Sequence, residues 1–430
     1  MRSFSIALAV SLLQALPVMK VGSAYAAEEP DRKSIEEPDR KSIYTPPCRE
    51  GQGEGLLTIT FTGDLLLDRG VRREIERHGS IPASPPFADS IPASRPDLSS
   101  IATAESRAHS ASIPYSLPEE GLESLFSSSI DSLFKQSQVV VANLECPATK
   151  IKAPVFKRYI FRAEPEWLPA LRRHGITHLC LANNHSIDQG REALMDTRRN
   201  IIAAGMTPVG ADSTMAAASQ PVLLATLYHQ NTQQTHPQPL PVGRGVYTLA
   251  DDNSENKGNY SPPSQGGVGG GSSGSSIRNV WLLASLRLTL ENFPYLEDRP
   301  CVSQEPMDSL LSRIARLRAD DPHAAIIVSL HWGAEHTLKP VPAQRIDAHR
   351  IIDAGADALI CHHTHTMQTV ETYHGKPIYY SIGNFIFDQP KPINSNAAVV
   401  KLTVTADSIA AETIPIVIRR CVPYIEGTCP

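Results

Sequence analysis

The feature that most constrains this chain is a series of short apolar runs that each end in polar side chains. The runs have the length of strands, and helical patterns of apolar residues lie between several of them. Strands that alternate with helices predict crossover connections and a largely parallel central sheet, with hairpins attached at about 367–388. The predicted strands lie at 56–64, 138–145, 176–185, 323–333 and 357–363, and the predicted helices at 119–137, 164–175, 190–205 and about 342–354. The sequence therefore predicts an α/β fold.

The polar residues at these strand ends are of the types that bind metals. In an open α/β sheet, ligands bind beyond the carboxyl ends of the strands, so these side chains are expected to converge. Carboxylate, amide and imidazole groups together suit Zn²⁺, Mn²⁺ or iron rather than Ca²⁺ alone. Singly, Asp64 could cap a helix, Asn183 could lie in a turn and His331 could be a hydrogen-bonded core residue. Their recurrence at one topological position favours a metal site. The residues concerned are Asp64, Asn143, Glu145, Asn183, Asn184, His185, His331, His362, His363 and His365.

The overall composition is that of an ordinary globular protein. Hydrophobic residues make up 41% of the chain and charged residues 20%, and the formal net charge is −5. A mildly acidic protein has no general electrostatic attraction to nucleic acid or to anionic lipid, and the sequence has no basic stripe with interleaved aromatic residues. Nucleic acid is therefore not an expected partner.

Residues 1–26 have the pattern of an export signal. Arg2 precedes an apolar run at 6–16 that is too short to span a bilayer, and 24–26 form a small-x-small cleavage site. The alternatives are an uncleaved N-terminal anchor and a buried helix. We therefore expect an exported protein, periplasmic or extracellular, which would associate with the membrane if the signal were retained.

Three further segments have compositions that cannot build a core. Residues 27–54 contain a tandem repeat of EEPDRKSI and are predicted to be a disordered linker. A single domain is expected at 55–418, with low-complexity insertions at about 79–118 and 229–276, the second at a hairpin tip. Residues 419–430 are expected to form a C-terminal tail. Within it, Cys421 and Cys429 could form a disulfide, and a total of seven cysteines leaves at least one without a partner in the chain.

Five motifs together resemble those of the CapA family of capsule or poly-γ-glutamate biosynthesis proteins. They are FTGDLLLDRGV at 61–71, VVVANLECPAT at 139–149, GITHLCLANNHSIDQG at 175–190, VSLHWGAEH at 328–336 and GADALICHHTHTMQTVETYHGKPIYYSIGNFIFD at 355–388. That family belongs to the calcineurin-like metallophosphoesterase superfamily. The resemblance therefore implies a four-layer α-β-β-α sandwich with a two-metal centre at the carboxyl ends of the strands.

The resemblance also implies a role for each candidate residue. His185 would be the catalytic histidine that contacts the leaving group or a substrate oxygen. The implied metal ligands are Asp64, Glu145 in place of a bridging aspartate, Asn184, His331, His363 and His365. Residues implied to contact the substrate or to support the ligands are Asn143, Asn183, His362 and Asn384.

One departure from the superfamily pattern affects the expected metal content. The first motif of the superfamily is Asp-x-His, whereas this chain has Asp64-Leu65-Leu66. The expected cofactor is a divalent transition metal, Mn, Zn or Fe, at two positions of which the first is only partly occupied. The expected function is metal-dependent hydrolysis of a phosphoester or a γ-glutamyl amide during synthesis, export or trimming of an anionic polymer. Expected partners are that polymer or its precursor and the membrane machinery of polymer synthesis. The alternative is a non-catalytic subunit that binds or assembles the polymer.

Overall fold

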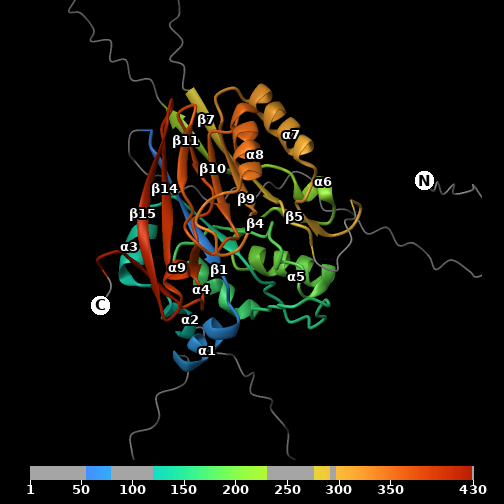
Figure 1. The fold of residues 1–430 in the computed structure, drawn as a ribbon, viewed down its shortest axis with the longest axis vertical. Coiled ribbons are helices and arrows are strands. Elements are labelled where there is room, and N and C mark those ends of the chain that lie inside the picture. Colours follow the sequence, from blue (N-terminus) through green and yellow to red (C-terminus); the bar gives the residue numbers. More distant parts are fainter. Residues whose placement is uncertain (1–54, 79–119, 230–275, 291–296, 429–430) are drawn as a thin grey trace, which may run out of the picture. The chain divides into compact units, whose positions relative to one another are not determined.

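The computed structural model describes residues 55–78, 120–229, 276–290 and 297–428. These residues all belong to one compact unit that spans 48–430 (Figure 1). The export signal, the 27–54 linker, the insertion at 79–118, the interior of the second insertion and Cys429 lie outside the described residues, so the predictions made for them stay predictions. No helix among the described residues is long and apolar enough to cross a membrane.

Two large sheets form the centre of the described part of the chain. The eight-stranded sheet has the order β16 (Val422–Ile425), β15 (Ile409–Arg419), β14 (Asn396–Val404), β1 (Leu57–Leu65), β2 (Val139–Leu144), β3 (His178–Cys180) and β4 (Thr207–Val209), with β13 (Asn384–Ile386) paired to the end of β1. The six-stranded sheet has the order β11 (Val370–Tyr373), β12 (Lys376–Tyr379), β10 (Ala358–His362), β9 (Ala325–His331), β7 (Ser276–Leu286) and β6 (Val222–His229). β5 (Ala211–Asp212) and β8 (Cys301–Val302) form a separate two-stranded sheet.

Helices cover the outer faces of the two large sheets (Figure 1). The core on the outer face of the eight-stranded sheet contains residues of α1 (Arg69–His78), α2 (Glu120–Glu123), α3 (Ser128–Lys135), η1 (Pro165–Trp167), α4 (Leu168–Arg173) and α5 (Gly190–Ala203). The core on the outer face of the six-stranded sheet contains residues of α7 (Met307–Asp320) and α8 (Pro342–Asp353). The short helices α6 (Met215–Ala218) and α9 (Pro392–Ser395) complete the set within the described residues.

The alternation of side chains along the strands explains why there are four layers. In β2, Val139 and Val141 point into the core between the sheets, whereas Val140 points into the core beneath the helices. In β9, Ile327 faces the other sheet and Ile326 faces α7 and α8. Successive side chains of a strand point to opposite faces, so a strand that is apolar at every position is buried on both. The predicted four-layer α-β-β-α sandwich is confirmed.

The pattern of strand pairing matches the prediction of a parallel centre with antiparallel additions. β1 to β4 pair in parallel, as do β7, β9, β10 and β12. β11 and β12 form the expected antiparallel hairpin within 367–388. The end of that segment leaves the six-stranded sheet, because β13 pairs with β1 of the other sheet. The segment from β12 to β13 thus connects the six-stranded sheet to the eight-stranded sheet at the end of β1.

The C-terminal boundary of the domain lies later than predicted. β15 continues through Arg419, and β16 pairs with it at 422–425, so the predicted tail begins inside the eight-stranded sheet. Cys421 is buried and not in a disulfide with any described residue.

The second insertion is flanked by β6 and β7, which pair in antiparallel fashion as expected for the two arms of a hairpin. The predicted helix at 119–137 is divided into α2 and α3.

Candidate metal centre

The candidate centre lies where strands of both sheets end. Asp64 at the end of β1 is in register with Asn143 of β2, and His331 at the end of β9 is in register with His362 of β10. Glu145 follows β2 directly and donates its backbone N–H to the Leu65 carbonyl. The two sheets therefore present acidic residues from one side and imidazoles from the other.

Two glycines bring the acidic side of the centre close to β13. The Asp64 N–H donates to the Gly383 carbonyl at 3.0 Å, so the chain after β12 lies directly against the end of β1. A Cβ atom at Gly63 would collide with that same carbonyl oxygen, and Gly383 has a φ of +78°, which favours glycine. This close approach places Asn384 beside Asp64 and His365.

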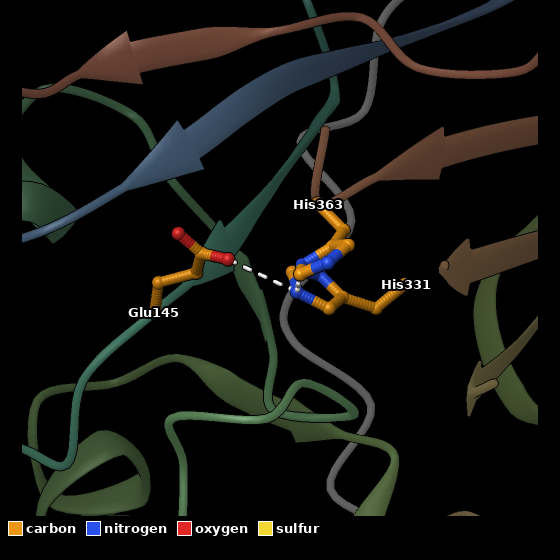
Figure 2. Close-up of side chains that lie close together, drawn as sticks. All are labelled: Glu145, His331 and His363. Carbon is orange, nitrogen blue, oxygen red and sulfur yellow. Dashed lines mark hydrogen bonds and ion pairs between the residues drawn. The ribbon is translucent and has the colours of Figure 1, made fainter. Parts of the chain in front are cut away.

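One group of candidate ligands consists of Glu145, His331 and His363 (Figure 2). Asn184 lies beside them. His331 Nε2 lies 3.0 Å from Glu145 Oε1 and 2.9 Å from Asn184 Oδ1. The same nitrogen lies 3.1 Å from His363 Nδ1. Four possible metal-ligand side chains from four separate segments thus meet at one point. Glu145, His331 and His363 are all buried.

A second group consists of Asp64, Glu145 and His365. His365 Nδ1 lies 3.4 Å from Asp64 Oδ2 and 3.8 Å from Glu145 Oε2. The same nitrogen lies 3.0 Å from Asn384 Oδ1. His362 Nδ1 lies 3.1 Å from Asp64 Oδ1, so His362 also contributes to the surroundings of this carboxylate.

Glu145 is the residue common to both groups. Its Oε1 faces His331 and its Oε2 faces His365. Both oxygens are buried and have no hydrogen-bond partner of acceptable geometry among the described residues. A buried carboxylate without hydrogen bonds costs several kcal/mol unless a cation compensates it. A divalent metal fits this donor set, because carboxylate, amide and imidazole are ligands that Zn²⁺, Mn²⁺ and iron accept.

Without a metal, the pKa values of the acidic side chains and of His365 also indicate that the centre lacks positive charge. Burial, together with the Asp64 charge, raises the pKa of Glu145 well above its ordinary value. Burial alone would raise the pKa of Asp64, but the nearby imidazoles of His362 and His365 hold it well below its usual range. Burial would lower the pKa of His365, yet Glu145 and Asp64 raise it to about 9. The centre therefore takes up protons where a metal would otherwise supply the positive charge.

The imidazoles of the first group are neutral in the bare protein. Burial and then the neighbouring imidazole of His363 lower the pKa of His331 well below its ordinary value. Burial and then His365 lower the pKa of His363 to about 4. A neutral imidazole is the form that binds a metal, so these two side chains are ready to coordinate at neutral pH.

The backbone at the histidine motif is strained. His363 has a φ of +96° and His365 a φ of +55°, conformations that L-residues other than glycine adopt rarely. Such strain costs roughly 1–3 kcal/mol per residue and persists where the surrounding structure requires it, often at functional sites. Here it points the imidazoles of His363 and His365 into the centre, one toward each ligand group.

His185 belongs to neither group of candidate ligands. Its Nδ1 lies 2.9 Å from Asp188 Oδ2 and 3.3 Å from Lys157 Nζ, and Lys157 also pairs with Asp188 at 2.8 Å. The Phe161 ring packs against the imidazole with centroids 4.4 Å apart. Burial lowers the pKa of His185, although Asp188 partly opposes the effect.

The remaining predicted residues support this arrangement. Asn143 donates to Asp64 Oδ1 at 2.8 Å, and Asn183 donates to Asn143 Oδ1 at 3.1 Å. Asn183 also accepts from the His185 backbone N–H. Leu66, at the position where the resemblance leads one to expect a histidine, is fully buried in the core beneath the helices.

Sequence reasoning missed Lys157, Phe161 and Asp188. Asp188 lies in the same motif as His185 and three positions after it, so a hydrogen-bonding partner for the histidine could have been sought there. Lys157 and Phe161 lie in a segment without helix or strand, 150–162, which carries no periodic signal. Asp188 holds this segment in place through the Phe161 N–H at 2.8 Å and the Lys157 ammonium.

Comparison with known proteins identifies the family of the chain. The family model "Bacterial capsule synthesis protein PGA_cap" matches residues 58–389. The PGA biosynthesis protein CapA of Bacillus subtilis is 26% identical over 308 residues, which are 71% of this chain and 68% of that protein. The capsule biosynthesis protein CapA of Bacillus anthracis is 27% identical over 303 residues, 68% of this chain and 61% of that protein. This chain thus spans only about three fifths of the length of the second relative.

Solved structures give a weaker likeness. The calcineurin-like phosphoesterase YfkN from Bacillus subtilis is matched with a TM-score of 0.37 and 12% sequence identity, over 84% of this chain and 91% of that one. The family model covers most of the sandwich and every candidate ligand described above. The chain belongs to the bacterial capsule synthesis protein PGA_cap family.

Proposed function

We propose that this protein is an exported metal-dependent hydrolase that acts on an anionic capsule-type polymer, such as poly-γ-glutamate, during its synthesis, export or trimming. The observation that carries the proposal is the position of Glu145, whose two buried oxygens face separate ligand groups and lack hydrogen bonds. The family to which the chain belongs, and relatives named for PGA and capsule biosynthesis, support the choice of polymer.

Two divalent cations, Mn, Zn or Fe, would polarise the bond under attack and activate a water molecule. Asn184, His331 and His363 would hold one of them, and Asp64 and His365 the other, with Glu145 shared. Asn143 would keep Asp64 oriented through its hydrogen bond. The ligands would thus be fixed before substrate arrives.

His185 would exchange a proton with the group that leaves. Its Nδ1 is closer to Asp188 than to Lys157, so the N–H at Nδ1 donates to the Asp188 carboxylate. This tautomer leaves Nε2 to take or deliver the proton. Phe161 covers one face of the imidazole and so limits its contact with water.

The test combines metal analysis with activity assays on the purified protein. We expect up to two equivalents of a transition metal, and hydrolysis of either a model phosphodiester or poly-γ-glutamate that stops on addition of a chelator and returns with metal. A protein that binds no transition metal under any condition would contradict the proposal. Comparison of the two substrates decides between phosphoester and γ-glutamyl amide hydrolysis.

A second candidate function is that of a non-catalytic subunit that binds or assembles the polymer within membrane synthesis machinery. The buried Leu66 favours it, because the first metal position lacks the histidine of the superfamily motif. His365 and His362 beside Asp64 count against it, since they offer imidazole nitrogens at that position. Full metal content with polymer binding and no turnover on either substrate would select this function.

A further inference from the structure

Arg69 contacts two aromatic rings that each pack against one side of the candidate metal centre. Its guanidinium carbon lies 5.2 Å from the centre of the Phe161 ring and 5.6 Å from that of the Phe387 ring. Phe161 packs against His185, and Phe387 packs against His365 with ring centroids 4.8 Å apart. One aromatic ring therefore separates Arg69 from the proposed catalytic histidine, and another separates it from a candidate ligand.

Several features hold Arg69 in this position. One Nη of the guanidinium pairs with the Asp388 carboxylate, whose other oxygen accepts the Gly70 N–H at 2.9 Å. A Cβ atom at Gly70 would lie 2.6 Å from the Asp388 Cβ, so only glycine allows this approach. Arg69 itself has a φ of +52°, in the left-handed region that non-glycine residues seldom occupy. An ordinary solvated arginine needs none of these features.

Part of the hydrogen-bonding capacity of Arg69 is unused. A guanidinium carries five N–H groups, and among the described residues the side chain has only Asp388 as a partner. Its Nε is buried without a hydrogen bond, while the side chain as a whole is 34% exposed. Arg72, one turn further, is different, because its guanidinium is occupied by Asp68, Glu164 and a main-chain carbonyl.

We propose that Arg69 forms a subsite that binds one anionic group of the ligand, a carboxylate or a phosphoryl group, beside the metal centre. The inference rests on the proposed function for the location of the reacting bond, but it concerns recognition rather than hydrolysis. The rings of Phe161 and Phe387 stabilise the cation through their faces and keep the guanidinium plane fixed. A planar, fixed guanidinium is suited to two parallel hydrogen bonds with an oxyanion. Arg69 thereby sets which acidic unit of a polymer lies next to the reacting bond.

The test measures binding of two probes to the metal-loaded full-length protein by calorimetry. The probes are a pentapeptide of γ-linked glutamate and inorganic phosphate. The variants are Arg69→Gln, Arg69→Lys and, as a matched control for the lost charge, Arg316→Gln. Arg316 is exposed on α7, which covers the other sheet. Metal content and melting temperature are measured for each variant.

We expect Arg69→Gln to weaken binding of at least one probe by about 10- to 100-fold, the usual effect of losing a charged hydrogen-bond donor. Arg69→Lys should weaken it less, because the charge remains and only the planar fork is lost. Arg316→Gln should stay within about twofold of wild type, as expected for a distant exposed charge. The probe that loses more affinity identifies the anionic group as carboxylate or phosphoryl.

Three results would overturn the inference: no binding of either probe to the wild-type protein, equal affinity of wild type and Arg69→Gln, or an equal loss in Arg316→Gln. If Arg69→Gln does not fold, the affinity of Arg69→Lys tests the inference instead. Unchanged affinity in that variant would refute a role for the planar guanidinium. Binding does not depend on turnover, because inorganic phosphate has no ester or amide bond to hydrolyse, and the peptide is checked for cleavage after each titration. A protein that binds the probes through Arg69 but hydrolyses nothing would therefore refute the proposed hydrolase alone.

Discussion

Replacement of Glu145 by glutamine should have opposite effects on stability with and without metal. Without metal, the pKa of Glu145 in the folded state lies well above its ordinary value of 4.5, because the carboxyl is buried and faces Asp64. The folded state then binds more protons than the unfolded state above pH 4.5, so wild-type stability falls as the pH rises toward the folded pKa. The slope is at most about 1.4 kcal/mol per pH unit, which limits the loss at pH 7 to about 3 kcal/mol. Glutamine does not titrate and avoids this loss.

With metal, the order should reverse. Glutamine cannot supply the shared carboxylate, so the variant should lose metal affinity and the stabilisation of about 2.7 kcal/mol that a ligand at 100 times its Kd provides. The assay is thermal unfolding of both proteins from pH 5 to 8, with EDTA and with Mn²⁺ or Zn²⁺. Glu412→Gln is the control, since Glu412 is 57% exposed on β15 and its replacement should change the free energy of unfolding by less than about 0.5 kcal/mol. Two results would refute the assignment of Glu145 as a shared metal ligand. One is a stability difference between Glu145→Gln and wild type that, in EDTA, does not grow with pH. The other is a variant that is less stable than wild type both in EDTA and with metal.

Three other outcomes are expected. His185→Ala should keep metal and fold but lower turnover by roughly 10²–10⁴, whereas His331→Ala should lose metal and activity together; equal metal loss in both would make His185 a ligand. Gly63→Ala should lower the free energy of unfolding by about 2 kcal/mol or more, because the new methyl group meets the Gly383 carbonyl, and chemical denaturation would measure this. Deletion of 233–273 with a short turn in its place should shift the melting temperature by no more than about 2 °C; a larger drop would mean that the insertion packs on the domain.

The alternation of strands and helices along the chain, and the residues at the strand ends, could be predicted from sequence. Asp64, Glu145 and His331 each follow an apolar run, and parallel strands bring such ends together whatever their separation along the chain. Strands that are apolar at every position need cover on both faces, which a single sheet between two layers of helices would also provide. The resemblance to a known family supplied the division into two sheets, which periodicity alone did not.

Other parts of the centre could not be predicted because they depend on loops. Lys157 approaches His185 from a segment with no repeating pattern, and its position is fixed by hydrogen bonds to Asp188 that only folding reveals. The crossing of β13 from one sheet to the other depends on the close contact of Gly63 and Gly383, which are 320 positions apart. The strand β16 cannot be distinguished from a tail in the sequence, because four residues after a turn give too short a pattern.

The attachment points of the second insertion have a practical consequence for engineering. β7 runs parallel to β9, and its last residue, Leu286, is in register with His331 at the centre. Its first residue, Ser276, pairs with His229 of β6 at the other end of the strand, roughly 30 Å away. A fluorescent protein, an affinity tag or a surface linker placed between 229 and 276 would therefore be joined at the end of the sheet opposite the candidate centre. Immobilised through this position, the protein would present its metal-binding edge to the solution.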